Sequence, residues 1–265
     1  MNYAEIIEAF KELLRGGATS KDLLILAANF RRKHIEMELF DDFNGIIQDG
    51  VFKGVKLSPA THDSVLTPKI LGTYEIEIAK YVKHFAEQSR VFINIGCADG
   101  YYTSGIAANT NIEKVVGIDI SSEALEIATK SAKQNQIIKK CIFKNKLKNA
   151  LPHLESGCFV MIDVDGSERE VLDELSAYIQ ASQLRKINIL METDFDKNKQ
   201  SNKQALAEKI INLGWTISEI VDCDPLCQSR FSPLARRVYS SYLDQMICAM
   251  ERGFSNQSWI IARTT

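Results

Sequence analysis

The stretch from Asn94 to Tyr102 holds the residues of this sequence that are best suited to chemistry. It reads Asn-Ile-Gly-Cys-Ala-Asp-Gly-Tyr-Tyr and follows the apolar run 91–93. Gly96 and Gly100 stand at the two ends of an expected turn, and glycine permits positive φ and a close approach of the backbone to a ligand. A strand, a glycine turn and a following helix place a ligand over the carboxyl end of the strand, where doubly wound sheets bind nucleotides.

The spacing of the glycines separates two classes of nucleotide ligand. A dinucleotide fingerprint needs glycine at the first, third and sixth positions. Counted from Gly96, the third position is Ala98 and the sixth is Tyr101, so that fingerprint fails. The spacing Gly96-x-x-x-Gly100 is the form common in methyltransferases of this fold, and a purely structural turn is the alternative. The candidate binding residues of this stretch are Asn94, Gly96, Cys97, Ala98, Asp99, Gly100 and Tyr101.

A carboxylate ends the next expected strand. The run Val115-Val116-Gly117-Ile118 leads to Asp119, 23 residues after Gly96. An acid at this strand end can accept both hydrogen bonds of a ribose diol. The alternative is an N-cap for the following helix, although Ser121 and Ser122 are available for that task. We therefore assign Asp119 to ribose binding and place Ile120, beside it, among the candidate binding residues.

Three further acids follow expected strands. Asp163 and Asp165 come directly after the run Phe159-Val160-Met161-Ile162, and Glu192 follows Ile189-Leu190-Met191. These strand ends should point at one crevice, and acids gathered beside a ligand cleft exceed what a core needs. Helix capping is the alternative for any one of them.

The elements that must position these residues alternate between strand and helix. Seven apolar runs predict strands at 91–95, 114–119, 141–144, 158–164, 186–191, 215–221 and 257–262. Helical patterns separate nearly all of them, as in βαβ units. Ser167 and Glu170 have the spacing of a capping box before one of these helices. The fold class is therefore α/β, with a doubly wound, seven-stranded, mostly parallel, Rossmann-like sheet.

The first part of the chain reads differently. Helical patterns cover 3–15 and 20–40, and from 41 to 73 glycine and proline break the pattern up. We expect residues 1–73 to form a helical N-terminal extension with an irregular connector, and residues 74–265 to form the binding domain. The extension suits a lid, a contact in a homo-oligomer or a substrate-selecting surface, and the sequence leaves these open.

Composition excludes several classes of protein. Lys plus Arg number 32 against 34 for Asp plus Glu, a net charge of -2, whereas a protein that grips a nucleic-acid backbone normally has a basic excess. No signal pattern opens the chain, and no apolar run reaches the roughly 20 residues that span a bilayer. The six cysteines lack metal-site spacing. We expect a cytoplasmic protein with reduced thiols, no resident metal and no membrane contact.

Several of these motifs together resemble the FkbM-type methyltransferases. The resemblance rests on the runs 94–103, Gly117-Ile118-Asp119 and Ile162-Asp-Val-Asp-Gly-Ser-Glu168, with support from Met191-Glu192 and from Leu71-Gly-Thr-Tyr-Glu75. It covers about residues 68 to 193 well and the C-terminal part loosely, and it does not reach residues 1–60. The run from Ile162 to Glu168 is its most specific part.

The resemblance implies S-adenosyl-L-methionine as cofactor and methyl transfer to a hydroxyl oxygen of a small molecule, such as a sugar or secondary metabolite. Two positions depart from the family pattern. Asn94 stands where the family usually has Asp, a position linked to the methionine amino group, and Asp165 stands where it often has Glu. The first change removes a charge, and the second shortens the reach of a carboxylate.

Methyl transfer to an alcohol mainly requires alignment of the acceptor and exclusion of water. An alcohol is a weak nucleophile at neutral pH and benefits from a base. We expect Asp163 or Asp165 in that role, with Glu192 in reserve and Asp163 also in contact with the cofactor. His62 and His84 are weaker choices.

Four alternatives stay open at this stage. An enzyme that methylates a nucleobase or protein amide commonly has an Asn-Pro-Pro-Tyr type run after the fourth strand, where this chain has Asp163-Val-Asp-Gly166. Metal-dependent catechol-type transfer would also use acids at these strand ends. A module that binds an adenosyl cofactor or nucleotide without catalysis fits the loss of charge at Asn94. A nicotinamide-dependent oxidoreductase requires the fingerprint that fails.

Overall fold

A computed structural model describes residues 3–59, 65–193, 202–223, 233–239, 241–249, 251 and 257–265. Seven strands form one sheet in the order β3-β2-β1-β4-β5-β7-β6. The strands are β1 (Val91–Ile95), β2 (Lys114–Ile118), β3 (Cys141–Lys144), β4 (Phe159–Ile162), β5 (Asn188–Thr193), β6 (Thr216–Asp222) and β7 (Ser258–Arg263). Every predicted strand is present, with bounds within two residues of those expected.

The sheet is parallel except at β7. β1 pairs in parallel with β2 and β4, and the parallel pairing continues to β3 on one side and β5 on the other. β7 lies antiparallel between β5 and β6. From β1 the chain runs outward through β2 to β3 and then crosses back to β4, on the other side of β1. The direction in which successive strands are added therefore reverses between β1 and β4. That switch point is where doubly wound sheets bind ligands, and the predicted Rossmann-like fold class is confirmed.

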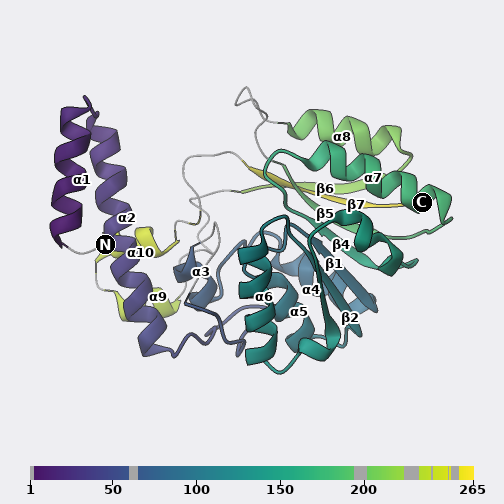
Figure 1. The fold of residues 1–265 in the computed structure, drawn as a ribbon, viewed down its shortest axis with the longest axis horizontal. Coiled ribbons are helices and arrows are strands. Elements are labelled where there is room, and N and C mark those ends of the chain that lie inside the picture. Colours follow the sequence, from purple (N-terminus) through teal and green to yellow (C-terminus); the bar gives the residue numbers. More distant parts are fainter. Residues whose placement is uncertain are drawn as a thin grey trace.

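Alternate side chains of the strands bury two separate apolar cores, one on each face of the sheet. Phe92, Val115 and Phe159 share a core with helices α4 (Ala79–Gln88) and α5 (Tyr101–Asn109). Ile93, Val116 and Val160 face the opposite way and share a core with α7 (Glu168–Ala181) and α8 (Lys203–Asn212). Figure 1 shows α7 and α8 on one face and α4, α5 and α6 (Ser122–Gln134) on the other. Short 3-10 turns complete the layers at η1 (Ile138–Lys140), η2 (Leu147–Asn149) and η3 (Leu151–His153).

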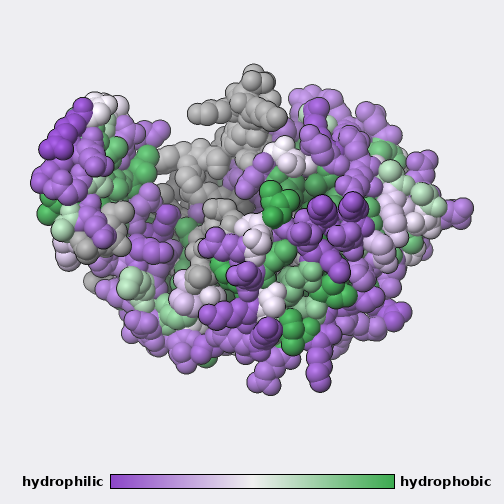
Figure 2. Space-filling view, viewed as in Figure 1, coloured by the Kyte–Doolittle hydropathy of each residue, from purple (hydrophilic) through white to green (hydrophobic). Residues whose placement is uncertain are grey.

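The N-terminal extension is helical, as predicted. Helix α1 (Tyr3–Arg15) packs on α2 (Ser20–Asp42), which begins at a capping box formed by Thr19 and Asp22. The two helices stand at the far side of the molecule from α8 (Figure 1), and Figure 2 shows their lobe as largely hydrophilic with apolar residues among the polar ones. Helix α2 contacts α3 (Leu66–Leu71) and α10 (Tyr242–Ala249), and α10 also contacts α9 (Pro233–Val238).

The connector holds more structure than its sequence indicates. Residues 66–71 form helix α3, and all six of them are buried. Ile47, Phe52 and Ile70 belong to the same apolar core as Phe92 of the central strand. The connector therefore packs directly on the α5 side of the sheet. Asn135, at the end of α6, fastens it further, because its side chain accepts from the backbone nitrogen of Lys56 and donates to that residue's carbonyl.

One local prediction is wrong. Ser167 precedes α7, but its side chain makes no capping hydrogen bond. Glu168 takes the local role instead, because its Oε1 accepts a hydrogen bond from the backbone nitrogen of Gly166 at 3.0 Å. The carboxylate thus folds back on the loop that precedes the helix rather than leaving that task to the serine.

Candidate functional site

The loop between β1 and α5 is shaped by its two glycines. Gly96 and Gly100 both have a φ of 84°, a conformation that residues with side chains rarely adopt. A Cβ at Gly96 would collide with the carbonyl oxygen of Asp163, and one at Gly100 would stand 2.9 Å from the Cα of Ala128 in α6. Both positions therefore require glycine, for conformation and for space.

Backbone hydrogen bonds hold this loop against the end of β2. The backbone nitrogens of Gly96 and Cys97 both donate to the carbonyl oxygen of Ile118, each at 2.8 Å. Ala98 between the glycines has a φ of 43°, which is uncommon for alanine. Burial raises the pKa of the Cys97 thiol, which keeps it neutral. The loop is thus a fixed cradle of backbone groups, and the thiol has a packing role in it.

Asp119 joins this cradle to the next helix. Its Oδ2 accepts a hydrogen bond from the backbone nitrogen of Ala98, and its Oδ1 accepts one from Ser121, both at 2.9 Å. The N-cap of α6 is Ser121, whose side chain accepts from the backbone nitrogen of Ala124. The carboxylate is therefore held in one orientation beside the glycine loop, and the capping task that was its alternative role belongs to the serine.

Ile120 stands out among the apolar side chains of the chain. It is 94% exposed, although it lies between the fixed carboxylate of Asp119 and the start of α6. An apolar surface at this place suits the face of a purine ring, since such a contact would remove it from water.

Asn94 is the buried polar residue of β1. Its side chain is 2% exposed, and its Oδ1 has no hydrogen-bond partner among the described residues. A buried acceptor without a donor is costly, and native structures usually satisfy it. An ammonium group brought by a ligand would supply the donor. The Asn94 acceptor therefore fits the ammonium at the methionine end of S-adenosylmethionine. It is an uncharged amide, and an acid at this position would attract the ammonium more strongly.

Two of the predicted acids follow β4 in the same crevice. The backbone nitrogen of Asp163 donates to the carbonyl oxygen of Ile95 at 2.9 Å, so the residue lies alongside the first turn of the glycine loop. Its side chain is partly buried, and that of Asp165 is exposed. Glu168 holds this loop in place. Its Oε1 accepts a hydrogen bond from the backbone nitrogen of Gly166, and its Oε2 accepts one from the side chain of Asn202, both at 3.0 Å.

Glu192 lies one strand further along the same edge. β4 and β5 pair at Ile162 and Met191, so Asp163 and Glu192 are the next residues on neighbouring strands. Glu192 is 3% exposed and lies opposite Trp259 of β7. Glu192 is therefore buried, whereas Asp165 is the acid of the three that is exposed to solvent.

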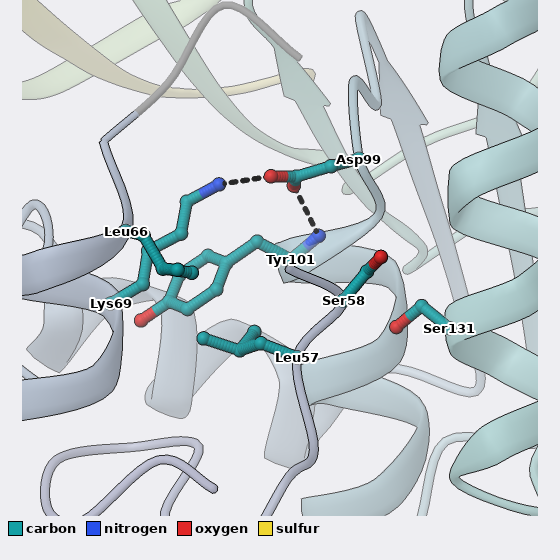
Figure 3. A pocket seen from close by; sticks show the side chains of 7 residues that line it. All are labelled: Leu57, Ser58, Leu66, Lys69, Asp99, Tyr101 and Ser131. Carbon is teal, nitrogen blue, oxygen red and sulfur yellow. Dashed lines mark hydrogen bonds and ion pairs between the residues drawn. The ribbon is translucent and has the colours of Figure 1, made fainter. Parts of the chain in front are cut away.

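Two side chains that sequence patterns did not indicate also reach the glycine loop. Lys69 of α3 forms an ion pair with Asp99, with 2.7 Å between its Nζ and Oδ2 (Figure 3). Glu75, just before α4, accepts a hydrogen bond from the hydroxyl of Tyr102. A φ of 47° at Glu75 marks it as an unusual backbone position for a residue with a side chain. Glu75 ends the run Leu71-Gly-Thr-Tyr-Glu75, which supports the family resemblance without giving Glu75 a role, and Lys69 lies outside that run.

Tyr101 and Tyr102 begin α5 as buried aromatic residues. Their rings lie edge to face with 5.1 Å between centroids, and both also contact Phe52 of the connector. Burial raises the pKa of both hydroxyls, and the nearby charge of Glu75 adds to it. Both tyrosines are therefore neutral hydrogen-bond donors at physiological pH.

The remaining candidates lie elsewhere. His84 is exposed on α4, and His62 is outside the described residues. Within the described ranges, no group of three or more His, Cys, Asp or Glu side chains lies close enough to hold a metal ion. No helix in that part of the chain is long and apolar enough to cross a membrane.

Comparison with known proteins adds a family to this geometry. The model of the methyltransferase domain family matches residues 86–224, more than half of the chain and all of β1 to β6. No curated protein matches the sequence.

Three of the similar solved structures align with nearly the same share of this chain. The precorrin 8W decarboxylase of Methanobacterium thermoautotrophicum has 17% identity and a TM-score of 0.47, over 72% of this chain and 90% of that one. The precorrin-6y C5,15-methyltransferase of Geobacter metallireducens GS-15 has 12% identity and a TM-score of 0.47, over 73% and 89%. TYW2 of M. jannaschii, in complex with AdoMet, has 11% identity and a TM-score of 0.44, over 71% and 74%.

Proposed function

We propose that this chain, which belongs to the methyltransferase domain family, transfers the methyl group of S-adenosylmethionine to a hydroxyl oxygen of a small molecule. Family membership establishes the reaction class and the methyl donor. The acceptor, the residues that act on it and the FkbM-type subfamily are our proposal.

The residues that would hold the cofactor lie on both sides of the glycine loop. Asp119 would accept the ribose hydroxyls, since each of its oxygens accepts one backbone hydrogen bond and has a second lone pair. Ile120 would cover the adenine, and Asn94 would accept from the ammonium group. The bound cofactor supplies an electrophilic methyl group on a sulfonium.

The position of Asp163 is the observation that carries the proposed acceptor chemistry. Its carbonyl oxygen occupies the space that a Cβ at Gly96 would need, so Asp163 lies directly beside the glycine loop that would hold the cofactor. A hydroxyl acceptor needs a base within hydrogen-bond reach of its proton. Asp163, or Asp165 two residues later, would accept that proton, with Glu192 as the buried acid behind them.

A small hydroxylated acceptor fits the chain better than a macromolecule does. The net charge of -2 provides no general attraction for a nucleic-acid backbone. The loop after β4 reads Asp163-Val-Asp-Gly166 and not Asn-Pro-Pro-Tyr. An FkbM-type assignment is supported by the same loop. The prediction that nucleic acid is not the acceptor stays a prediction.

The test is transfer of a labelled methyl group from S-adenosylmethionine to a panel of sugars and hydroxylated secondary metabolites, with transfer RNA and ribosomal RNA in parallel. We expect a hydroxyl compound to accept the label, and Asp163→Ala to lower kcat at least a hundredfold. Glu174→Ala, an exposed acid on α7, serves as control. Label found only on RNA would contradict the acceptor class. Cofactor binding without transfer to any acceptor would favour a non-catalytic module.

A further inference from the structure

Lys69 is a charged residue in a place where charge is costly. Its side chain is 2% exposed, and it sits in α3, a short helix whose six residues are all buried. Lysine is rarely buried unless it is paired, because removing an ammonium from water is expensive. The sequence therefore keeps a cation inside the connector at a considerable cost, which calls for an account of what it faces.

The ammonium faces the glycine loop and the start of α5. It lies 2.7 Å from Asp99 Oδ2, and Asp99 Oδ1 accepts from the backbone nitrogen of Tyr101 at 3.2 Å. The rings of Tyr74 and Tyr101 each have their centroid 5.1 Å from Lys69 Nζ. Figure 3 shows the lysine and Asp99 meeting at one end of a cavity, with Ser58 and Ser131 farther along its lining.

The charges around this cavity have both signs. Lys69 and the N-terminal end of the nine-residue helix α5 supply positive potential. Asp99 supplies a negative charge, and the carboxylates of Glu75 and Glu251 also act electrostatically on Tyr101. A simple anion would meet these carboxylates as well as the lysine. A carboxylate that carries an ammonium on the same carbon suits this mixed field better than a simple anion does, because the ligand's net charge there is zero.

S-adenosylmethionine has such a group at its methionine end. In the cofactor site proposed above, Asp119 would take the ribose and Asn94 the ammonium, and Lys69 brings a cation to the same glycine loop through its ion pair with Asp99. We propose that Lys69 binds the carboxylate of the methyl donor and that Asp99 positions the lysine for it. This inference rests on cofactor binding at the glycine loop, as proposed above. It gives the connector a direct part in cofactor recognition, although it lies outside the matched region 86–224.

A double-mutant cycle between protein and ligand tests the contact. Calorimetry would compare S-adenosylmethionine with decarboxylated S-adenosylmethionine, on the wild type and on Lys69→Met. We expect removal of the ligand carboxylate to raise Kd at least tenfold in the wild type. In Lys69→Met we expect Kd for S-adenosylmethionine to rise by the same factor. Kd for the decarboxylated compound should change by less than twofold between the wild type and this variant. Pairs in direct contact give such non-additive effects. Lys83→Met, exposed on α4, is the control and should change neither Kd.

A second variant guards against a folding defect. Lys69→Met leaves Asp99 without its cation, and an unpaired buried charge destabilises strongly. Lys69→Met/Asp99→Asn removes both charges, and thermal unfolding without ligand would show whether it folds. It should bind the decarboxylated compound as the wild type does and S-adenosylmethionine at least tenfold more weakly. An equal loss for both ligands, or no loss for either, would overturn the proposal. A wild type that binds neither ligand would overturn the cofactor site itself.

Discussion

The carbonyl oxygen of Asp163 occupies the space that a Cβ at Gly96 would need. This relationship joins the loop after β1, which would hold the cofactor, to the loop after β4, which holds the candidate base. The two loops are in backbone contact, so the geometry of one fixes the geometry of the other. It also explains why glycine is required at this point by the loop after β4 and not only by the turn that contains Gly96.

Gly96→Ala should therefore damage both stability and cofactor binding. A left-handed conformation costs a non-glycine residue about 1–2 kcal/mol, and the collision with Asp163 adds to that cost. We expect the free energy of unfolding to fall by about 3 kcal/mol or more, and Kd for S-adenosylhomocysteine to rise at least tenfold. Urea unfolding and calorimetry measure the two effects.

Gly157→Ala is the matched control for that variant. Gly157 has a φ of 80°, but nothing lies within 4 Å of the added Cβ. It should lose only the conformational part, about 1–2 kcal/mol, and bind the cofactor normally. Equal losses of stability in the two variants would show that the contact between Gly96 and Asp163 has no effect of its own.

Asn94→Asp should tighten cofactor binding and weaken the ligand-free protein. A carboxylate at this buried position has to give up hydration, which an ammonium partner compensates only in the complex. We expect Kd for S-adenosylmethionine to fall about threefold to tenfold, and the Tm without ligand to fall. 5′-Methylthioadenosine, which lacks the ammonium group, should show no gain. A gain for both ligands would remove the link between Asn94 and the methionine end.

Glu168→Ala should destabilise the loop that carries Asp163. Both oxygens of this buried carboxylate accept hydrogen bonds, from Gly166 and from Asn202. Loss of bonds to a buried charged group costs about 1–3 kcal/mol each when a donor is left unpaired. We expect urea unfolding to show a loss of about 2–4 kcal/mol. Glu170→Ala, exposed in the same first turn of α7, should stay within 0.5 kcal/mol of the wild type, roughly as surface substitutions do.

The ion pair between α2 and α10 should give a measurable pH dependence. Arg31 donates two hydrogen bonds to Asp244, which lowers the pKa of that carboxyl below 3.8. A depressed folded-state pKa stabilises above the unfolded value, and the contribution disappears as pH falls through the folded value. The side chain of Arg31 is 43% exposed, so the contribution is about 1 kcal/mol after solvent screening.

Asp244→Asn should thus be less stable than the wild type at pH 7. The difference should shrink once pH falls below about 3.8, the ordinary value for this group. Urea unfolding of both proteins at pH 7, 5 and 3.5 measures it. A difference that stays constant down to pH 3.5 would mean that the ion pair is not its source.

The strands and the glycine loop could be predicted from sequence because their causes are local. A strand buried on both faces reads as a short apolar run, and glycine or aspartate follows where the chain leaves the sheet. Phe159 to Ile162 shows this, as does Val91 to Ile95. Asp119 and Asp163 were predictable for the same reason, since their place is set by the strand that precedes each of them.

Lys69, Glu75 and the capping of α7 could not be predicted in this way. Lys69 is tolerated inside α3 because Asp99, thirty positions away, pairs with it, and no local pattern encodes that partner. Ser167 and Glu170 had a local capping signal, but Glu168 reaches Gly166 and also Asn202, a tertiary contact that prevails over the local one. Connector residues 41–73 were predicted as irregular because glycine and proline dominate their pattern, and tertiary packing on α5 produces α3.

Binding of the methyl donor at the glycine loop and Asp119 is tested most directly by calorimetric titration with S-adenosylmethionine, S-adenosylhomocysteine and NAD, on the wild type and on Asp119→Ala. Glu123→Ala, exposed in the first turn of α6, is the control. We predict saturable binding of both adenosyl compounds, no binding of NAD, and a Kd that rises at least tenfold in Asp119→Ala but not in Glu123→Ala. Absence of adenosyl binding, or a preference for NAD, would contradict the assignment of the glycine loop and Asp119 to this cofactor.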